Sequence, residues 1–127
     1  MSLVVVGSFG LDTVETPFGR REEVLGGSAI YFSLAASLFT DVRLAGNVGA
    51  DFPDAALETL KRRGADCSGI QVYKDQQTFR WAGRYEGDMN EAETLVTELN
   101  VLAEPPKIPD SYKGAPYVFL ANMGPDT

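Results

Sequence analysis

An uncharged, helix-like stretch places the strongest constraint on how this chain folds. Residues 29–39 carry no charge, and Ile30, Leu34 and Leu38 recur at the four-residue spacing that stacks side chains along one helix face. Aromatic and small residues cover the other faces of the same segment. The pattern predicts a helix that is enclosed nearly all round and lies at the centre of a domain.

Short apolar runs on either side of this helix predict a parallel sheet. Residues 3–7 read LVVVG, and VRLAGNVG follows the helix at 42–49. Continuous runs of this kind are typical of strands covered on both faces. An amphipathic helix at 54–63 and a strand at 69–73 continue the alternation that characterises α/β folds. The run at 115–121 is also expected to be a strand buried on both faces.

Two features point to a site beside the first strand. Gly26 and Gly27 supply backbone freedom at the start of the helix, and Ser28 is predicted to be its N-cap. Asp12 follows the first strand, and ligands collect at the carboxyl ends of strands in open α/β sheets. Asp12 is therefore a candidate functional carboxylate. A turn-stabilising aspartate that bonds its own backbone explains the position equally well.

The second half of the chain has a different pattern. In TFRWAGRYE the two-residue period places Phe79 and Trp81 on one face and Arg80 and Arg84 on the other. The segment 94–102 is predicted to be a hairpin partner. A helix there remains an open alternative, because the residues before it resemble a capping box.

Composition excludes several classes of function. The net charge of −7 and the pI near 4.5 argue against nucleic-acid binding, since no basic stripe is available. The chain has no histidine and one cysteine, Cys67, which excludes histidine-based catalysis, an internal disulfide and a multi-cysteine metal site. No metal site is predicted. No apolar run reaches the ~18 residues of a membrane span, so no membrane partner and a cytoplasmic location are expected.

The ordered set of motifs resembles the amino-terminal half of the ribokinase-like sugar kinases, the PfkB carbohydrate kinase family. It comprises LVVVGSFGLDTVETPFG, LGGSAIYFSLAASLF, VRLAGNVGADFP, LKRRGADCSGIQV, a lid-like strand pair and YVFLANM, and it covers essentially the whole chain. The resemblance implies a three-layer α/β core, incomplete here, with a small β lid from segments of about 12–23 and 75–102. Residues 1–127 would then lack the carboxy-terminal catalytic and nucleotide-binding half. The expected unpaired sheet edge after 115–121 agrees with an interrupted chain.

The same resemblance implies ATP-dependent phosphorylation of a sugar or nucleoside hydroxyl. ATP and Mg²⁺ would serve the full-length parent, which would pair as a homodimer through its lids. The family's D-T-x-G-A-G-D motif does not occur, so this chain is expected to hold no catalytic residue, to bind no cofactor and to be inactive alone. Two alternatives stay open: a non-catalytic sugar-binding, nucleoside-binding or lid-pairing regulatory module, and a dinucleotide binder with Gly-Ser-Phe-Gly as its phosphate loop.

The resemblance also assigns roles to particular residues. Asp12 matches the aspartate that binds substrate hydroxyls, and an ionised carboxylate can accept bonds from two adjacent alcohols. Gly26 and Gly27 match the glycines that let the backbone approach the sugar.

Four further residues are carried over with looser support. Tyr31 stands where the family usually has an asparagine, which indicates a larger or less polar substrate unless Tyr31 only packs. Arg80 or Arg84 is expected near an anionic substrate group, with the aromatic face of the lid at an interface. Asn122 lies near a substrate-contacting polar position.

Overall fold

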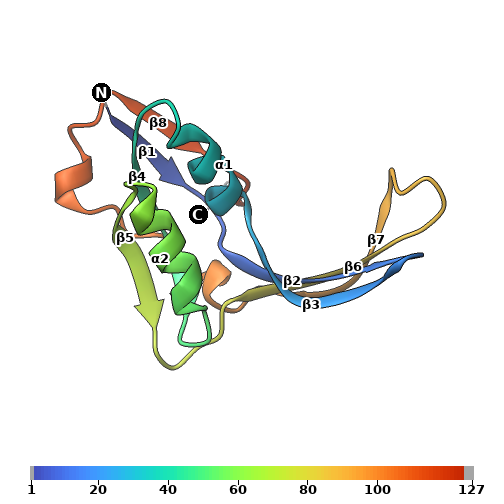
Figure 1. The fold of residues 1–127 in the computed structure, drawn as a ribbon. Coiled ribbons are helices and arrows are strands. Elements are labelled where there is room, and N and C mark those ends of the chain that lie inside the picture. The colour runs from blue at the N-terminus through green and yellow to red at the C-terminus, as the bar shows by residue number, and fades with distance from the viewer. Residues whose placement is uncertain (1, 125–127) are drawn as a thin grey trace.

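Two four-stranded sheets carry the fold, which the computed structural model describes for residues 2–124 (Figure 1). The first is parallel throughout and has the order β5-β4-β1-β8, with β5 Asp66–Tyr73, β4 Asp41–Gly49, β1 Ser2–Val6 and β8 Tyr117–Leu120. The second has the order β3-β2-β6-β7, with β3 Gly19–Gly26, β2 Gly10–Thr16, β6 Phe79–Tyr85 and β7 Ala92–Glu98. The first is called the core sheet and the second the lid. The predicted α/β fold with a small β lid is confirmed.

Both α-helices, α1 Ser28–Ala36 and α2 Asp54–Arg62, cover the same face of the core sheet (Figure 1). Because β1, β4 and β5 follow one another in one direction across the sheet, right-handed connections place both helices on one side. β8 lies on the other side of β1, so the chain reaches it across the opposite face through the short turns η1 Asn100–Ala103 and η2 Asp110–Tyr112. No helix in residues 2–124 is long and apolar enough to cross a membrane.

The core lies between the two helices and the sheet. Its buried side chains come from β1, β4, α1 and α2 and include Val5, Leu44, Ile30 and Leu60. A smaller cluster on the opposite face centres on Tyr112, whose hydroxyl donates to the Leu44 carbonyl over 3.0 Å. Only the helix-covered face is therefore a closed layer within the described residues.

The helix α1 is shorter and more exposed than the sequence predicts. It ends at Ala36, and the Leu38 and Phe39 residues that follow are 68% and 87% exposed. Within α1 the buried residues are Ala29, Ile30 and Ser33. Nearly complete enclosure was the wrong expectation, because the described residues cover α1 only on its sheet side.

The entrance of α1 is capped by a distant loop. Gly27, with φ 102°, is the N-cap, and Ser28 is the first helical residue, so the predicted N-cap was wrong by one position. The Ser8 hydroxyl accepts the N–H of Ser28 over 3.2 Å, and the Ser8 carbonyl accepts the N–H of Ala29 over 3.1 Å. A Cβ on Gly27 would lie 2.8 Å from the α-carbon of Phe9, so this position requires glycine for its φ and for the close approach.

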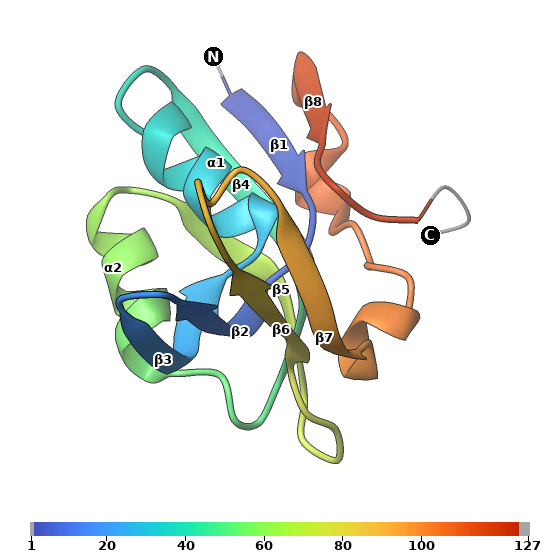
Figure 2. The same cartoon turned by 90° about the vertical axis from the view of Figure 1, so that its right-hand side faces the viewer.

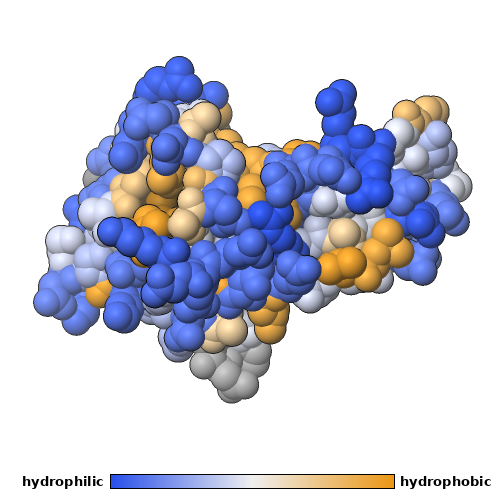
Figure 3. Space-filling model, turned by 90° about the horizontal axis from the view of Figure 1, so that it is seen from below, coloured by the Kyte–Doolittle hydropathy of each residue, from blue (hydrophilic) through white to orange (hydrophobic). Residues whose placement is uncertain are grey.

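The strand β8 is an exposed edge, which contradicts the prediction of burial on both faces. Val118 is 59% exposed and Leu120 is 76% exposed. Phe119 stacks on Phe32 of α1 with ring centroids 3.7 Å apart. The other face borders an apolar hollow of about 380 Å³ that also includes Ile108. Figure 3 shows apolar side chains reaching the surface over the core on the left and over the lid on the right.

The lid consists of two hairpins joined by a parallel pair (Figure 2). β2 and β3 form the first hairpin, β6 and β7 form the second, and β2 runs parallel to β6. The predicted hairpin partner is present, but the strand spans Ala92–Glu98 and not 94–102, because the chain turns into η1 at Asn100. The alternative of an α-helix in this segment is wrong. Asp12 lies inside β2 and not in a turn at the end of β1.

Replacing Gly27 by alanine is expected to destabilise the protein because the new Cβ meets Ser8 and adopts a strained φ. The strain alone costs on the order of 1–3 kcal/mol. Gly64→Ala is the matched control, since Gly64 has φ 84° but no neighbouring atom within 4 Å of a built Cβ. Urea denaturation should show a larger loss of unfolding free energy for Gly27→Ala than for Gly64→Ala. Equal losses would show that the close approach does not matter.

Candidate functional site

The Asp12 side chain lies against the glycine turn that begins α1. In the β2–β3 hairpin Gly10 pairs with Gly26, so their α-carbons and the Asp12 side chain share one face of the lid. A Cβ built on Gly26 would lie 2.6 Å from Asp12 Cγ, and one built on Gly10 would lie 3.6 Å from Asp12 Oδ1. Since these spaces are open only for glycine, the carboxylate can rest on bare backbone. Two predicted features of the site are thus brought together.

The Asp12 carboxylate is half-buried and unpaired. Among residues 2–124 no hydrogen-bond donor or cation holds it, and burial raises its pKa. A partly desolvated carboxylate without a partner opposes folding. A ligand hydroxyl that donates to it would remove that penalty, which is the behaviour expected of a binding group.

Three segments meet beside this corner. The hydroxyls of Ser8, after β1, and of Ser28, at the start of α1, lie 3.3 Å apart. The backbone N–H of Asn122, after β8, donates to the Ser28 hydroxyl over 3.2 Å. Asn122 is therefore placed next to the helix entrance through its backbone, and the residue itself is exposed.

Tyr31 is also placed near the helix entrance. It is 56% exposed, and its hydroxyl donates to the Leu25 carbonyl over 2.5 Å. The phenol therefore links α1 to the end of β3, while the oxygen lone pairs stay available to accept a bond. Surface hollows lie in the lid, beside β8 and along α1, and neither Asp12 nor Tyr31 lines them.

The lid arginines do not join Asp12. In the parallel β2–β6 pair, Leu11 faces Arg80 and Asp12 faces Trp81. Because side chains alternate along a strand, Asp12 shares its face with Trp81, and Arg80 points to the opposite face. Phe79 is on the Asp12 face, and one of its ring atoms lies 3.0 Å from a Cβ built on Gly10. The aromatic face, and not the basic face, is next to the candidate carboxylate.

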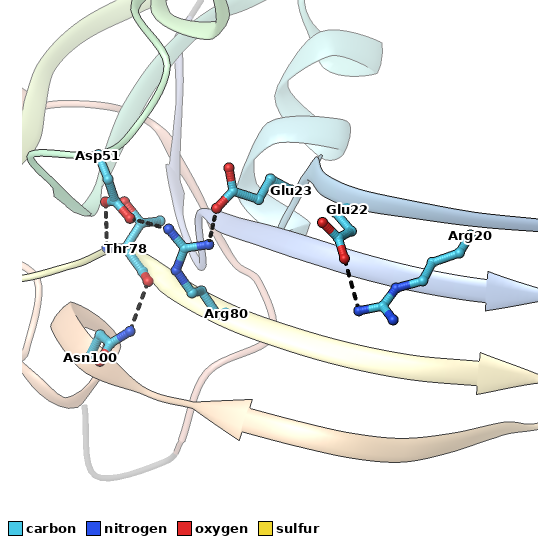
Figure 4. Close-up of polar contacts among 7 residues, drawn as sticks. All are labelled: Arg20, Glu22, Glu23, Asp51, Thr78, Arg80 and Asn100. Carbon is cyan, nitrogen blue, oxygen red and sulfur yellow. Dashed lines mark hydrogen bonds and ion pairs between the residues drawn. The ribbon is translucent and has the colours of Figure 1, made fainter.

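Arg80 is held by two carboxylates (Figure 4). Its Nη1 donates to Glu23 Oε1 and its Nη2 donates to Asp51 Oδ2, each over 2.6 Å. The hydrogen bond to Glu23 is the main cause that raises the pKa of the guanidinium. Two carboxylates outnumber one guanidinium here, so the cluster offers little attraction for an anionic substrate group. The role predicted for Arg80 gains no support from this geometry.

Arg84 is paired within the lid. Its Nε lies 3.3 Å from Glu15 Oε2 on β2, and its Nη1 lies 4.0 Å from Glu93 Oε2 on β7. The side chain of Arg84 is 39% exposed, so these pairs are open to solvent screening. Arg84 therefore lies away from the Asp12 corner.

Asp51 binds both Thr78 and Arg80 at the base of the lid, a role that the sequence does not reveal. Its sequence position indicates a turn or helix-cap role, yet the N-cap of α2 is Pro53 and no side chain caps that helix. Asp51 Oδ1 instead accepts the backbone N–H of Thr78 over 2.8 Å. Burial alone would raise the Asp51 pKa, but hydrogen bonds from Thr78 and Arg80 outweigh it and lower the pKa. No local motif signals contacts between residues so far apart in the chain.

Residues 2–124 form neither a cluster of metal ligands nor a phosphate-binding turn. Residues 2–124 contain no group of three or more His, Cys, Asp or Glu side chains arranged to hold a metal ion. The Gly7–Gly10 loop leads into a strand and not into a helix, so it does not form the phosphate-binding turn of a dinucleotide fold. We therefore assign no residue of this chain to a metal or a nucleotide.

Comparison with known proteins gives one significant curated relative. No family model matches the chain. A cytidine kinase from Thermococcus kodakarensis is 28% identical over 127 residues, which cover 99% of this chain and 45% of that protein. The chain therefore spans about half the length of the curated relative that it matches.

Solved structures show the same fold. A nucleoside kinase from Methanocaldococcus jannaschii, described as an archaeal member of the ribokinase family, matches 98% of this chain and 46% of its own, with a TM-score of 0.76 and 19% identity. A ribokinase from Cryptococcus neoformans in complex with ADP matches 94% and 40%, with a TM-score of 0.69 and 20% identity. A Burkholderia thailandensis nucleoside kinase in complex with inosine matches 79% and 36%, with a TM-score of 0.65 and 21% identity. The resemblance to ribokinase-like kinases is confirmed at the level of the fold.

Asp12→Asn is expected to stabilise the free protein at pH 7. Because burial raises the folded-state pKa of Asp12, its ionised form opposes folding above that pKa, and the penalty disappears below the unfolded-state pKa of about 3.9. Urea denaturation from pH 7 to pH 3 should show the gain shrinking as the pH falls. Asp51→Asn is the control of opposite sign: its lowered pKa contributes stability above about pH 3.9 that is lost in acid. A loss of stability in Asp12→Asn at pH 7 would contradict this account.

Proposed function

We propose that this chain, which has the fold of the amino-terminal part of ribokinase-like kinases, is the substrate-binding half of an ATP-dependent kinase. The substrate is a sugar or a nucleoside, and one of its hydroxyls receives the phosphoryl group. The fold and the names of the relatives support this proposal. The carboxy-terminal catalytic and nucleotide-binding half is proposed to come from residues outside 1–127.

The observation that carries the proposal is the unpaired Asp12 carboxylate beside Gly26. Its two oxygens can accept hydrogen bonds from adjacent hydroxyls of one ligand. Because Gly26 has no side chain, the Asp12 carboxylate lies against the backbone at the helix entrance, and the polyol is proposed to bind there. Charged hydrogen bonds of this kind contribute about 1.5–3 kcal/mol each.

The role of this half is to bind and orient the substrate. Phosphoryl transfer depends mainly on positioning and on stabilisation of charge, so a carboxylate that fixes two hydroxyls also fixes the direction of a third. When bound to the parent enzyme, ATP with Mg²⁺ supplies the phosphoryl group. The residues that would hold them are proposed to lie in the other half.

Among the two substrate classes, the site favours a nucleoside. Phe79 and Trp81 lie on the same face of the lid as Asp12, and aromatic rings stack well on a base. Tyr31 adds a third ring near the helix entrance. The relatives include a cytidine kinase and a nucleoside kinase in complex with inosine. We assign the ribose diol to Asp12 and the base to the aromatic face.

Exposed apolar side chains on the lid support pairing with a second copy. Phe18 in the β2–β3 turn is 89% exposed, and Val24 and Val96 are 38% and 46% exposed. Large exposed apolar side chains, such as Phe18 at the end of the lid, are typical of interaction surfaces. A homodimer joined through the lids therefore belongs to the proposal.

Calorimetric titration of the protein with cytidine, inosine and ribose tests the binding role. We expect tighter binding of the nucleosides than of ribose, and an affinity loss of about 10-fold or more in Asp12→Asn, since each 1.4 kcal/mol is tenfold. Asp75→Asn removes an equal charge from an exposed turn and is expected to bind like the original protein. Equal nucleoside affinities for the original protein, Asp12→Asn and Asp75→Asn would overturn the assignment of Asp12.

The isolated 127-residue chain is expected to show no phosphoryl transfer. ATP, Mg²⁺ and each nucleoside would be incubated with it, and the phosphorylated product would be measured by mass spectrometry. The physical reason is that a bound alcohol without a base, an anion hole and a nucleotide pocket lacks the groups that the reaction requires. Robust turnover would refute the proposal that substrate binding and phosphoryl transfer belong to different halves of the parent enzyme.

A further inference from the structure

The lid meets the core at a short segment that begins β6. Thr78 is buried, and its hydroxyl accepts the N–H of Gly49, at the end of β4, over 2.9 Å. Its backbone N–H donates to Asp51, in the loop that follows β4. Two residues later Arg80 bonds the same carboxylate. The end of β4 and the loop that follows it are therefore bonded to residues 78–80 by three hydrogen bonds.

Two residues with strained backbone contact the same segment, one in the lid strand β3 and one at the start of η1. Glu23 in β3 has φ 52° and Asn100 after β7 has φ 49°, both in the left-handed region that non-glycine residues avoid. Glu23 accepts a bond from Arg80, and Asn100 Nδ2 donates to the Thr78 carbonyl over 3.0 Å (Figure 4). Such strain persists where the surrounding structure enforces it, and it concentrates at functional and switch positions.

Arginine suits the junction for a geometric reason. Its planar guanidinium presents separate N–H groups that can reach two carboxylates at once, whereas a lysine ammonium is a point charge on a flexible stem. The side chains of Arg80 and Asp51 are 24% and 26% exposed, so their pair is screened less than a surface pair. Glu23, at 64% exposed, is the more solvent-accessible of the two carboxylates that bind Arg80.

The other ion pairs of the lid differ in what they connect. Arg84 pairs with Glu15 on the neighbouring lid strand, and Arg20 pairs with Glu22 on its own strand. Among the ion pairs of residues 2–124, the pair between Arg80 and Asp51 is the one that joins the lid to the loop after β4.

We infer that Arg80 is a positioning residue that fixes the angle of the lid and so holds Asp12 at the glycine corner. Arg80 pairs in register with Leu11, the neighbour of Asp12, so a tilt of β6 at its base moves β2 and the Asp12 carboxylate with it. Arg80 lies on the opposite face of the lid from Asp12. It therefore affects the substrate only by positioning Asp12. The inference rests on the proposed function for its substrate part only, because the lid angle can be measured without a ligand.

Spin-label distances between core and lid test the inference. In a Cys67→Ser background, labels at Glu58→Cys on α2 and Asp88→Cys in the β6–β7 turn occupy exposed positions of the core and the lid. We expect Arg80→Gln to broaden or shift the distance distribution and Arg80→Lys to give an intermediate distribution. Arg84→Gln is the matched control, with the same charge change on the same strand, and should leave the distribution unchanged.

Nucleoside affinity, measured on the same variants, separates positioning from simple stabilisation. Arg80→Gln is expected to lose about 10-fold in affinity and Arg84→Gln to lose little, with partial rescue by Arg80→Lys. An unchanged distance distribution in Arg80→Gln overturns the inference, whatever the ligand does. A changed distribution with affinity unaltered overturns the link to Asp12. If the original protein binds no nucleoside, the proposed function fails, while a loosened lid in Arg80→Gln still supports the role of Arg80 in setting the lid angle.

Discussion

The contact between the Ser8 loop and the α-carbon of Gly27 is the constraint on which the rest of the structure depends. The Ser8 carbonyl and hydroxyl satisfy the first two N–H groups of α1, and they can do so only because Gly27 has no side chain. Ser8 lies where the chain passes from β1 of the core sheet into β2 of the lid, and Gly27 lies where it returns from β3 to α1. The contact therefore joins these two connections between core and lid. The lid hairpin that carries Asp12 is therefore anchored at both ends, and the carboxylate is held where the backbone is bare.

The features predicted correctly from the sequence are those set by local patterns. Continuous apolar runs at 3–7 and 42–49 predicted strands of a parallel sheet, because buried strands need apolar side chains on both faces. The alternation in TFRWAGRYE predicted a strand with one aromatic and one basic face. The glycine pair and Asp12 were recognised as parts of one site, and the structure brings them together. Their roles toward a substrate stay predictions.

The features that the sequence did not predict depend on contacts between distant segments. An apolar run signals that its side chains tend to be covered but not what covers them, so the exposure of Phe39 after α1 and of Leu120 in β8 was missed. The sequence predicted Arg80 to be available to a substrate, because its partners Glu23 and Asp51 lie 57 and 29 residues away along the chain. The Ser8 cap was missed for the same reason, since it replaces a local N-cap at Ser28 from 20 residues away.

The open side of β8 has a consequence for how this molecule behaves in solution. The outer edge of the strand carries backbone N–H and C=O groups with no neighbouring strand in residues 2–124, and Val118 and Leu120 stand exposed beside them. A flat apolar edge of this kind recruits a further strand by β-augmentation. An extended segment that paired with this edge would gain backbone hydrogen bonds and bury the apolar side chains beside them at the same time.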